Sequence, residues 1–367
     1  MAIKEIASRL SNDFEFDLIT AKFEKNLPPR EKIGNVTVWR IGFGKPNLDK
    51  ILLPFLGALK AHKLHRKNNY FCFWSVMASF GGGTAYLLNI FYKIFGMKKV
   101  PIVLSLQEGD SEDHFKYRWL GLVNLSWKMA LKRTDFLTAL SHFLLDRAKK
   151  KYGFTGPKVL VPNGVDVSFF SAVSRIEQTE EVLRKIHKKS GEILLVTVSR
   201  LVHKNAIDDV VSSMVYLPTH IRFIILGNGP EIHNLKRQVK KLALSERVSF
   251  IGFISHRDLP SYLHQCDIFV RPSRSEGFGN SFIEAMAARI PVIATPVGGI
   301  PDFLDDRETG IFCAPDDPKS VAEAVKTILS EKSLREHMIS SAFNRVSNLY
   351  DWSRIAELMK NEVFDKI

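Results

Sequence analysis

The feature that most constrains the fold is a regular alternation of short apolar runs and helix-like segments between residues 193 and 330. Apolar runs rich in β-branched residues predict strands at 193–199, 221–226, 248–250, 268–270 and 291–294. The intervals contain segments with a helical pattern, at 231–244, 258–265, 281–288 and 318–330. Strands that alternate with helices predict a parallel sheet with helices on both faces. In such sheets, ligands bind in the loops beyond the carboxyl ends of the strands.

The N-terminal half shows the same alternation less regularly. Helical patterns occur at 2–11 and 49–67, and runs that predict strands occur at 14–20, 36–41, 71–76, 102–106 and 136–140. A last run, 158–166, leads into a turn at Pro162-Asn163-Gly164. A chain of 367 residues is too long for one ordinary core. We therefore predict an α/β protein of two domains, with the junction near residue 165.

The positive charge lies entirely in the N-terminal half. Residues 1–165 contain 26 Lys and Arg against 13 Asp and Glu, whereas residues 166–367 contain 26 of each kind. A basic field on one side indicates a polyanionic partner, such as acidic lipid head groups, a phosphorylated acceptor or nucleic acid. The alternative is that these residues only keep a small domain soluble.

Cysteine content and hydropathy bear on location. The three cysteines are far apart in the sequence, which favours a reducing compartment over a disulfide framework or a structural zinc site. The longest apolar stretches, 51–59 and 86–97, are shorter than the roughly 20 residues of a spanning helix. The first ten residues have an amphipathic pattern and lack the apolar core of a signal peptide. We therefore expect a cytoplasmic protein, and contact with a membrane surface remains open.

The most specific motif runs from Arg271 to Gly299. The strand at 268–270 leads into a loop with Gly277 and Gly279, and Asn280 or Ser281 then caps a helix. Glycines let backbone N–H groups approach a ligand closely, and the N-terminus of a helix favours phosphate oxygens. The carboxylates of Glu276, in the loop, and Glu284, one turn into the helix, can face the same crevice. One could hold a transferred sugar and the other a ribose, because carboxylates accept hydrogen bonds from hydroxyls. A plain tight turn with a solvated Glu284 is the alternative.

A second motif follows the strand at 193–199. Arg200 and Lys204 come at the carboxyl end of that strand, where two cations suit a diphosphate. Surface cations are common, so this motif indicates a diphosphate site only in combination with the first motif. The turn Gly227-Asn228-Gly229-Pro230 lacks the third glycine and the acidic residue of a dinucleotide fingerprint. We expect Gly229 to line the same crevice and expect no NAD site.

These motifs resemble those of the retaining glycosyltransferases of family 4. The resemblance is strong over residues 158–330 and is carried by the Glu276-x7-Glu284 spacing, Arg200 with Lys204, the Thr-Pro-Val-Gly-Gly segment and Pro162–Asp166. It implies the GT-B fold, in which two Rossmann-like domains face each other across a cleft. It also implies an N-terminal domain at 1–165, a donor-binding domain at 166–340 and a last segment, 341–367, that crosses back to the first domain.

The resemblance assigns roles to individual residues. It assigns Arg200 and Lys204 to the donor diphosphate, although Lys204 comes one position earlier than in many members of the family. It assigns Glu276 to the transferred sugar and Glu284 to the ribose. It places the residues between them beside the sugar and the phosphates: Gly277, Phe278, Gly279, Asn280 and Ser281. Replacing Glu276 or Arg200 by Ala should abolish transfer with little loss of thermal stability.

The N-terminal half departs from the family. Members usually open with a strand and a Gly-Gly loop, whereas this chain begins at what looks like the following helix, so its first strand is expected to be missing. Either the start lies upstream or the domain lost the strand. Glu108 and Asp110 stand where many members have His-Gly, and they line the acceptor side of the cleft or form a structural turn. The glycines 81–83 are expected to serve backbone packing, and lining the cleft is the alternative.

The expected activity is retaining transfer of a sugar from a nucleoside-diphosphate sugar, the substrate, without a metal or another cofactor. No DxD-type cluster and no nucleophile stands out. The acceptor is left open, with a lipid-linked or surface-polysaccharide acceptor suggested by the basic half. The helix at 49–67, apolar early and basic late, suits contact with an anionic bilayer as well as it suits a solvated helix end. The alternatives are a non-catalytic nucleotide-sugar-binding scaffold and a nucleic-acid-binding protein, whose motifs are lacking.

Overall fold

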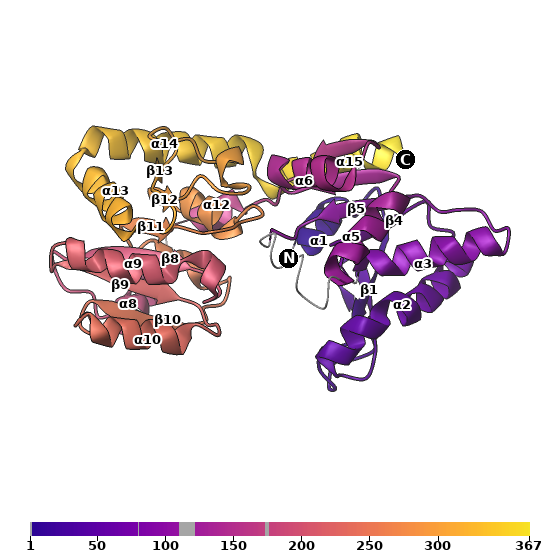
Figure 1. Cartoon of the computed structure of the whole chain (residues 1–367), viewed down its shortest axis with the longest axis horizontal. Helices are drawn as coiled ribbons and strands as arrows, with labels where there is room; N and C mark the ends of the chain where they lie inside the picture. Colours follow the sequence, from indigo (N-terminus) through magenta and orange to yellow (C-terminus); the bar gives the residue numbers. More distant parts are fainter. Residues whose placement is uncertain (1, 80, 110–121, 173–175) are drawn as a thin grey trace. The chain divides into compact units, whose positions relative to one another are not determined.

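The chain folds into two compact units in a computed structural model that describes residues 2–79, 81–109, 122–172 and 176–367 (Figure 1). Unit 1 comprises Met1–Asn163 and Trp352–Ile367, and unit 2 comprises Gly164–Asp351. The segment that returns to unit 1 is α15 (Trp352–Glu362), which starts later than the expected boundary at residue 341. The reason is that α14 (Lys332–Leu349) buries Met338 and Val346 within unit 2.

Unit 2 contains a six-stranded sheet in the order β10-β9-β8-β11-β12-β13, and every neighbouring pair is parallel. This confirms the predicted parallel sheet. Its strands are β8 (Ile193–Val198), β9 (Ile221–Leu226), β10 (Val248–Gly252), β11 (Ile268–Arg271), β12 (Val292–Ala294) and β13 (Ile311–Phe312). Its helices are α7 (Val167–Ser171), α8 (Ile176–Ile186), α9 (Ile207–Ser213), α10 (Ile232–Lys241), α11 (Leu259–Leu263), α12 (Asn280–Ala287), α13 (Pro318–Ser330) and α14.

Local sequence explains these elements. Every residue of β9 is buried, which is why an uninterrupted apolar run forms this strand between two helical layers. Helix α13 begins where the Asp317 carboxylate accepts hydrogen bonds from the N–H groups of Lys319 and Ser320, with Pro318 in the first turn. Its buried side chains join Leu195 and Phe223 of the sheet in one large core.

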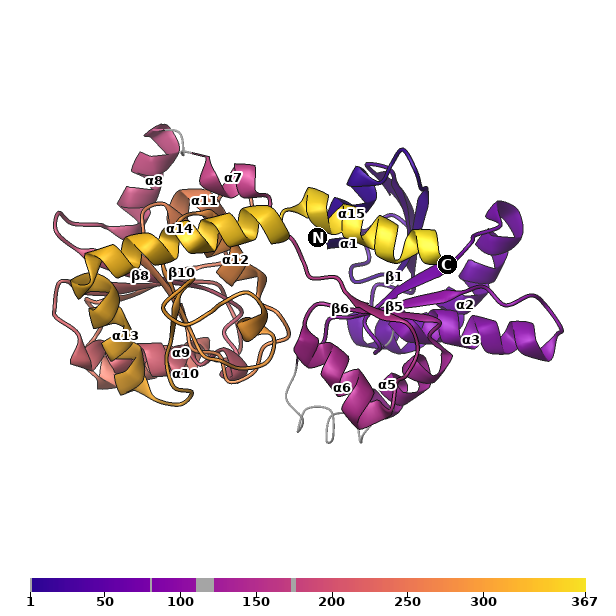
Figure 2. The same cartoon turned by 90° about the horizontal axis from the view of Figure 1, so that it is seen from above.

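Unit 1 contains two separate sheets. The first has the order β4-β5-β6-β7 and is parallel, and in the second β1 pairs with β3 in parallel while β2 and β3 form an antiparallel pair. The strands are β1 (Phe16–Ala21), β2 (Arg30–Ile33), β3 (Val36–Ile41), β4 (Phe73–Val76), β5 (Ile102–Leu106), β6 (Phe136–Ala139) and β7 (Lys158–Leu160). The helices are α1 (Ala2–Arg9), α2 (Pro46–Asn68), α3 (Gly81–Ile94), α5 (Leu122–Arg133) and α6 (His142–Tyr152), and α15 packs beside α1 (Figure 2).

A cavity of about 690 Å³ lies between the two sheets of unit 1. All residues of β1 and of β4 line it. Most of these residues are only half-buried, whereas every residue of β5 is buried. Among the described residues, β1 follows α1, which is the order predicted for the helix at 2–11 and the strand at 14–20.

Helices α2 and α3 pack against each other along their lengths. Gly83 makes this close approach feasible, because a Cβ atom there would lie 2.9 Å from the Pro54 side chain. The expected packing role of the glycines 81–83 is thus visible at Gly83. None of the described helices combines the length and apolar composition needed to cross a bilayer.

Candidate functional site

The two motif-bearing loops of unit 2 lie side by side. Strands β8 and β11 are parallel neighbours, with Leu195 opposite Ile268, so the loops that follow them leave from the same edge of the sheet. The Arg274 N–H donates to the carbonyl oxygen of Lys204 at 2.8 Å, and Nη1 of Arg274 donates to that of His203 at 2.8 Å. The Arg200 loop and the Glu276 loop are therefore held against each other.

Arg274 is the residue that joins these loops. Its guanidinium pairs with Asp208 at 2.9 Å, Asp209 at 3.1 Å and Asp316 at 2.5 Å. Asp209 is buried, and this burial raises the pKa of its carboxyl group to about 6. No local pattern in the sequence reveals this cluster, because its members come from three separate segments.

Arg271, at the end of β11, fixes the Glu276 carboxylate. The Arg271 side chain is 6% exposed, and its Nη2 donates to Oε2 of Glu276 at 2.7 Å. Its Nη1 donates to the Ser281 hydroxyl at 2.7 Å and to the carbonyl oxygen of Val198 at 3.3 Å. Burial lowers the pKa of Arg271, which the neighbouring carboxylates oppose. The sequence did not reveal a role for Arg271. The one signal that it offered was an arginine directly after an apolar run.

Two glycines shape the loop around Glu276. Gly279 has φ +100°, and a Cβ atom there would lie 2.5 Å from the Phe282 ring and 3.0 Å from Nη2 of Arg271. Gly298 has φ +59°, and a Cβ atom there would lie 1.9 Å from the carbonyl oxygen of Glu276. The N–H of Gly299 donates to the same oxygen at 3.1 Å. The Val-Gly-Gly segment therefore supports the Glu276 loop directly.

Helix α12 begins at Asn280, and Gly279 before it provides no side-chain cap. The backbone N–H of Gly277 donates to Oε1 of Glu276 at 2.9 Å, and the Phe278 side chain is buried. Glu284 is buried one turn into the helix and lies 3.4 Å from Nε2 of His256. The Arg271 guanidinium interacts electrostatically with both Glu276 and Glu284.

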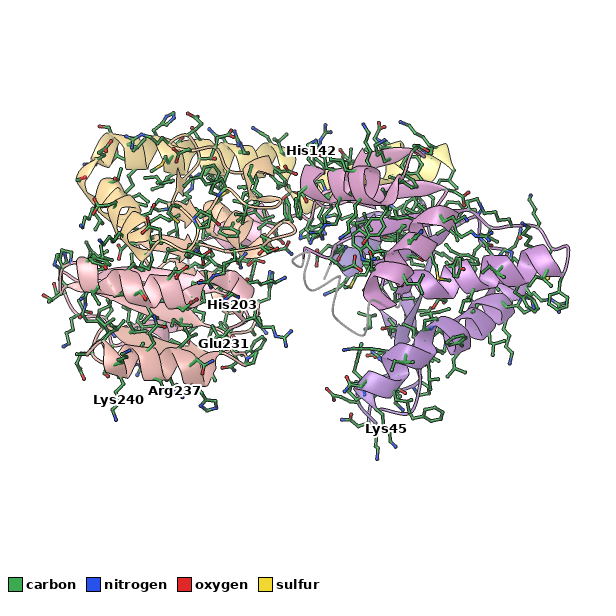
Figure 3. All side chains as sticks on the ribbon, viewed as in Figure 1. Lys45, His142, His203, Glu231, Arg237 and Lys240 are labelled. Atoms are coloured by element: carbon green, nitrogen blue, oxygen red, sulfur yellow. The ribbon has the colours of Figure 1, made fainter. Side chains whose placement is uncertain are left out.

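The turn with Gly229 lies against the Arg200 loop. A Cβ atom on Gly229 would lie 2.2 Å from the carbonyl oxygen of Leu201, and the N–H of Glu231 donates to this oxygen at 3.0 Å. His203 and Glu231 accordingly lie near each other in Figure 3, whereas Arg237 points outward from α10. The structure thus places the turn at Gly227–Pro230 beside the loops that carry Arg200 and Glu276. We call these three segments the loop cluster.

The exposed cation of this cluster is Arg200. Among the described residues, its side chain forms no ion pair, and its carbonyl oxygen accepts a hydrogen bond from Nδ2 of Asn205. The Lys204 side chain is half-buried. Four of the seven buried side-chain polar atoms that lack a hydrogen-bond partner in the described part of the chain lie at or near the ends of β8 and β11: Thr197 Oγ1, Ser199 Oγ, Arg271 Nε and Ser273 Oγ. Such groups mark places where polar ligands or water can bind.

The acceptor-side candidates lie in unit 1. Glu108 is buried, and the Ser79 N–H and hydroxyl both donate to its Oε1 at 2.9 Å. Burial raises the pKa of Glu108. Through these hydrogen bonds Glu108 holds the loop after β4 in place. Asp110 lies outside the described residues.

Comparison with known proteins identifies the fold and the relatives. The profile of a family described as "Glycosyl transferases group 1" matches residues 178–345. Glycogen synthase of Mycobacterium tuberculosis is 26% identical over 235 residues, which cover 63% of this chain and 54% of that protein. The match thus spans about half the length of the relative.

Solved structures extend the likeness to the whole chain. Sucrose-phosphate synthase from Thermosynechococcus elongatus aligns with a TM-score of 0.85 and 20% identity, over 99% of this chain and 92% of that one. Anabaena HepE in complex with UDP-glucose aligns with a TM-score of 0.76 and 17% identity, over 100% and 95% of the two chains. Both likenesses show the fold, which is GT-B with two Rossmann-like domains, as expected from the motifs.

Proposed function

Residues 178–345 match the profile of the glycosyl transferases group 1 family, and on this basis we propose that the protein is a retaining glycosyltransferase that uses a nucleoside-diphosphate sugar. The observation that carries the proposal is the loop cluster at the ends of β8 and β11. It combines an exposed cation, Arg200, with a fixed carboxylate, Glu276, and the N-terminus of α12. Such a cluster suits an anionic diphosphate with a polyhydroxylated group attached.

The proposed reaction breaks the bond between the anomeric carbon and the diphosphate oxygen. Negative charge then develops on the diphosphate, and Arg200, Lys204 and the N-terminus of α12 stabilise it without a metal. The acceptor hydroxyl attacks the face that the diphosphate leaves, and a diphosphate oxygen takes its proton. The configuration is thereby retained with no covalent enzyme intermediate.

The two carboxylates of the cluster hold hydroxyl groups of the donor. We assign Glu276 to the transferred sugar and Glu284 to the ribose of the nucleotide, with the segment Gly277–Ser281 beside the sugar and phosphates. Both carboxylates interact with the buried Arg271, which supports their placement on one side of the loop cluster. Neither carboxylate then has to change its position or its charge state when the donor binds.

Arg200→Ala tests the donor site, because this exposed side chain contributes little to stability. A thermal-shift screen of UDP-glucose, GDP-mannose and ADP-glucose identifies the donor of the wild-type chain. The variant should bind that donor about 10-fold to 100-fold more weakly, because it loses the binding free energy of a charge-assisted hydrogen bond. Its melting temperature without ligand should stay within about 2 °C of wild type.

The matched control is Arg237→Ala, which removes another exposed arginine of unit 2 and should leave donor binding unchanged. Equal donor affinity of the Arg200 variant and wild type would remove the proposed diphosphate site. Release of nucleoside diphosphate separates an enzyme from a nucleotide-sugar-binding scaffold. Donor binding with no release in the presence of membrane extract would favour the scaffold.

We further propose that the acceptor is lipid-linked or lies at an anionic membrane, reached from the cytoplasmic side. Residues 41–107 contain one acidic residue, Asp49, and it is buried. Large apolar side chains are exposed on the neighbouring helices α2 and α3, including Phe55 (60%), Leu59 (62%) and Ile94 (72%). Exposed apolar groups among basic residues suit an anionic lipid surface.

The membrane proposal is tested by co-sedimentation with vesicles of phosphatidylcholine alone or with 30% phosphatidylserine. The wild-type chain should bind the anionic vesicles at least about 10-fold more tightly, because each nearby cation adds about 1 kcal/mol. Phe55→Ser should weaken this binding, whereas Phe253→Ser, at a still more exposed phenylalanine of unit 2, should not. Equal binding to neutral vesicles, or equal effects of the two variants, would contradict the proposal.

A further inference from the structure

Helix α12 carries a buried carboxylate to which no nearby group donates a hydrogen bond. The Glu284 side chain is 11% exposed, and among the described residues its carboxylate accepts no hydrogen bond. Glu276 differs, because its two oxygens accept from Arg271 and from the N–H of Gly277. Burial of a carboxylate is costly unless partners replace the water that it loses. The side chains around Glu284 therefore show what directs it before a ligand binds.

The basic group beside Glu284 is the imidazole of His256. Its Nε2 lies 3.4 Å from Oε1 of Glu284, and no other basic side chain of the described residues comes within 4 Å of this carboxylate. Arg271 interacts with the carboxylate electrostatically, but its Nη1 and Nη2 donate to Ser281 and Glu276. A shift of about 0.5 Å brings the imidazole and the carboxylate to an ordinary hydrogen-bond distance. His256 is thus the side chain placed to direct Glu284.

Two phenyl rings support the imidazole. The Phe169 ring stacks on it, with ring centroids 6.0 Å apart and 19° between the planes, and the Phe170 ring meets it edge-on at 5.2 Å. Both phenylalanines belong to α7, which packs against α12 and begins where the Asp166 carboxylate accepts the N–H of Phe169. Because Phe170 is fully buried, this support belongs to the core of unit 2. The ring of His256 is therefore held beside Glu284.

The loop that carries His256 starts at the same edge of the sheet as the loop cluster. It follows β10, and the N–H of Gly227 donates to the carbonyl oxygen of Gly252, the last residue of β10, at 2.7 Å. His256 thus comes from the β10 side of the sheet, whereas the loops of Arg200 and Glu276 follow β8 and β11. Segments after several strands of the sheet therefore contribute to one site.

We propose that His256 is a positioning residue for ribose recognition, and that its imidazole directs the Glu284 carboxylate toward the ribose hydroxyls of the nucleotide. This inference rests on the proposed assignment of Glu284 to the ribose. With its proton on Nε2, the imidazole donates to Oε1, and the remaining lone pairs of the carboxylate accept from the hydroxyls. A carboxylate that is already directed loses less conformational freedom when the nucleotide binds, which raises the affinity.

The test uses the intact chain and two nucleotides that differ only in the ribose. The first is UDP, GDP or ADP, as selected by the thermal-shift screen, and the second is its 2′,3′-dideoxy form. Isothermal titration calorimetry measures both dissociation constants. The wild-type chain should bind the ribonucleotide about 10-fold to 100-fold more tightly, because only this form has hydroxyls for Glu284. Glu284→Gln should reduce this preference at least about 5-fold.

Three variants then isolate the role of the imidazole. His256→Phe keeps a ring against Phe169 and Phe170 but has no N–H, so it should weaken ribonucleotide binding about 5-fold and dideoxynucleotide binding less than about 2-fold. His256→Gln retains an N–H donor and should bind the ribonucleotide within about 2-fold of wild type. The matched control is His233→Phe, at an exposed histidine of α10, which should leave both affinities unchanged.

The outcomes separate this inference from the proposed function. If the wild-type chain prefers the ribonucleotide and Glu284→Gln loses that preference, the ribose assignment stands. An unchanged preference in His256→Phe would then overturn only the positioning role, and so would equal losses of ribonucleotide affinity in His256→Phe and His256→Gln. Equal weakening of both nucleotides by His256→Phe would indicate a structural role and likewise overturn it. A wild-type chain that binds both forms equally, or a Glu284→Gln variant with an unchanged preference, would overturn the ribose assignment and this inference together.

Discussion

Removing the Glu276 carboxylate should destabilise unit 2 as well as impair sugar binding. In Glu276→Ala the buried Arg271 guanidinium keeps two weaker acceptors, the Ser281 hydroxyl and the carbonyl oxygen of Val198. Breaking a buried ion pair costs about 3–5 kcal/mol, and the remaining acceptors place this case near about 3 kcal/mol. For a domain of 150–250 residues, about 2–4 °C per kcal/mol predicts a melting temperature lower by about 6–12 °C.

This prediction differs from the sequence-based expectation that Glu276→Ala would leave thermal stability nearly unchanged. The difference has one physical cause, the ion pair with Arg271, whose burial the sequence did not reveal. Glu276→Gln separates the two effects. Its amide oxygen still accepts from Arg271, so its melting temperature should fall by only about 2–4 °C, while donor turnover still falls by at least about 10-fold.

Scanning calorimetry and donor turnover at matched concentrations provide the measurements. The control is Glu323→Ala, which breaks an exposed ion pair with Lys326 and should change the melting temperature by less than about 2 °C. A Glu276→Ala chain that melts within 2 °C of wild type would refute the role of the buried pair. Equal losses in the Ala and Gln variants would refute the argument from the retained acceptor.

Two further predictions concern the loop cluster. Gly298→Ala should lower both the melting temperature and donor affinity, because its Cβ would collide with the Glu276 carbonyl; Gly191→Ala, with φ +78° but open space around it, should cost about 1 kcal/mol and leave donor affinity unchanged. Asp209 has a pKa raised to about 6 by burial, so the folded state binds its proton more tightly than the unfolded state does. Stability from this group is therefore present below about pH 4 and is lost as the pH rises to about 6, and Asp209→Asn should remove that part of the pH dependence in calorimetry.

The sequence predicted unit 2 well because its strands are buried on both faces. The strand at Ile221–Leu226 and the helix at Pro318–Ser330 have the predicted bounds. Two other strands, β13 and β2, gave no usable signal in the sequence. β13, Ile311–Phe312, is too short to show a period, and β2, Arg30–Ile33, is mostly charged because it is an exposed strand of a hairpin.

The candidate site was only partly predictable for a different reason. Its motif residues stand close together in the sequence or directly after predicted strands, so the ordering of a parallel sheet brings them to one edge. Arg274 was not identified, because its partners include Asp208 and Asp316, and only the folded chain brings these together. His256 likewise lies beside Glu284 only in the folded chain, because the two residues come from segments that no local sequence pattern connects.

The geometry of Glu276 favours binding of the proposed donor without a rearrangement of the loop cluster. One carboxylate oxygen accepts from Arg271 and the other from the N–H of Gly277, so both are engaged. Each oxygen of a carboxylate nevertheless has a second lone pair, which can accept a hydrogen bond from a sugar hydroxyl. The ion pair would therefore not compete with the sugar of the proposed donor, and it fixes the direction of the remaining lone pairs. Because the Arg274 cluster also fixes the neighbouring loop of Arg200, the side chain left to order on donor binding is mainly Arg200 itself.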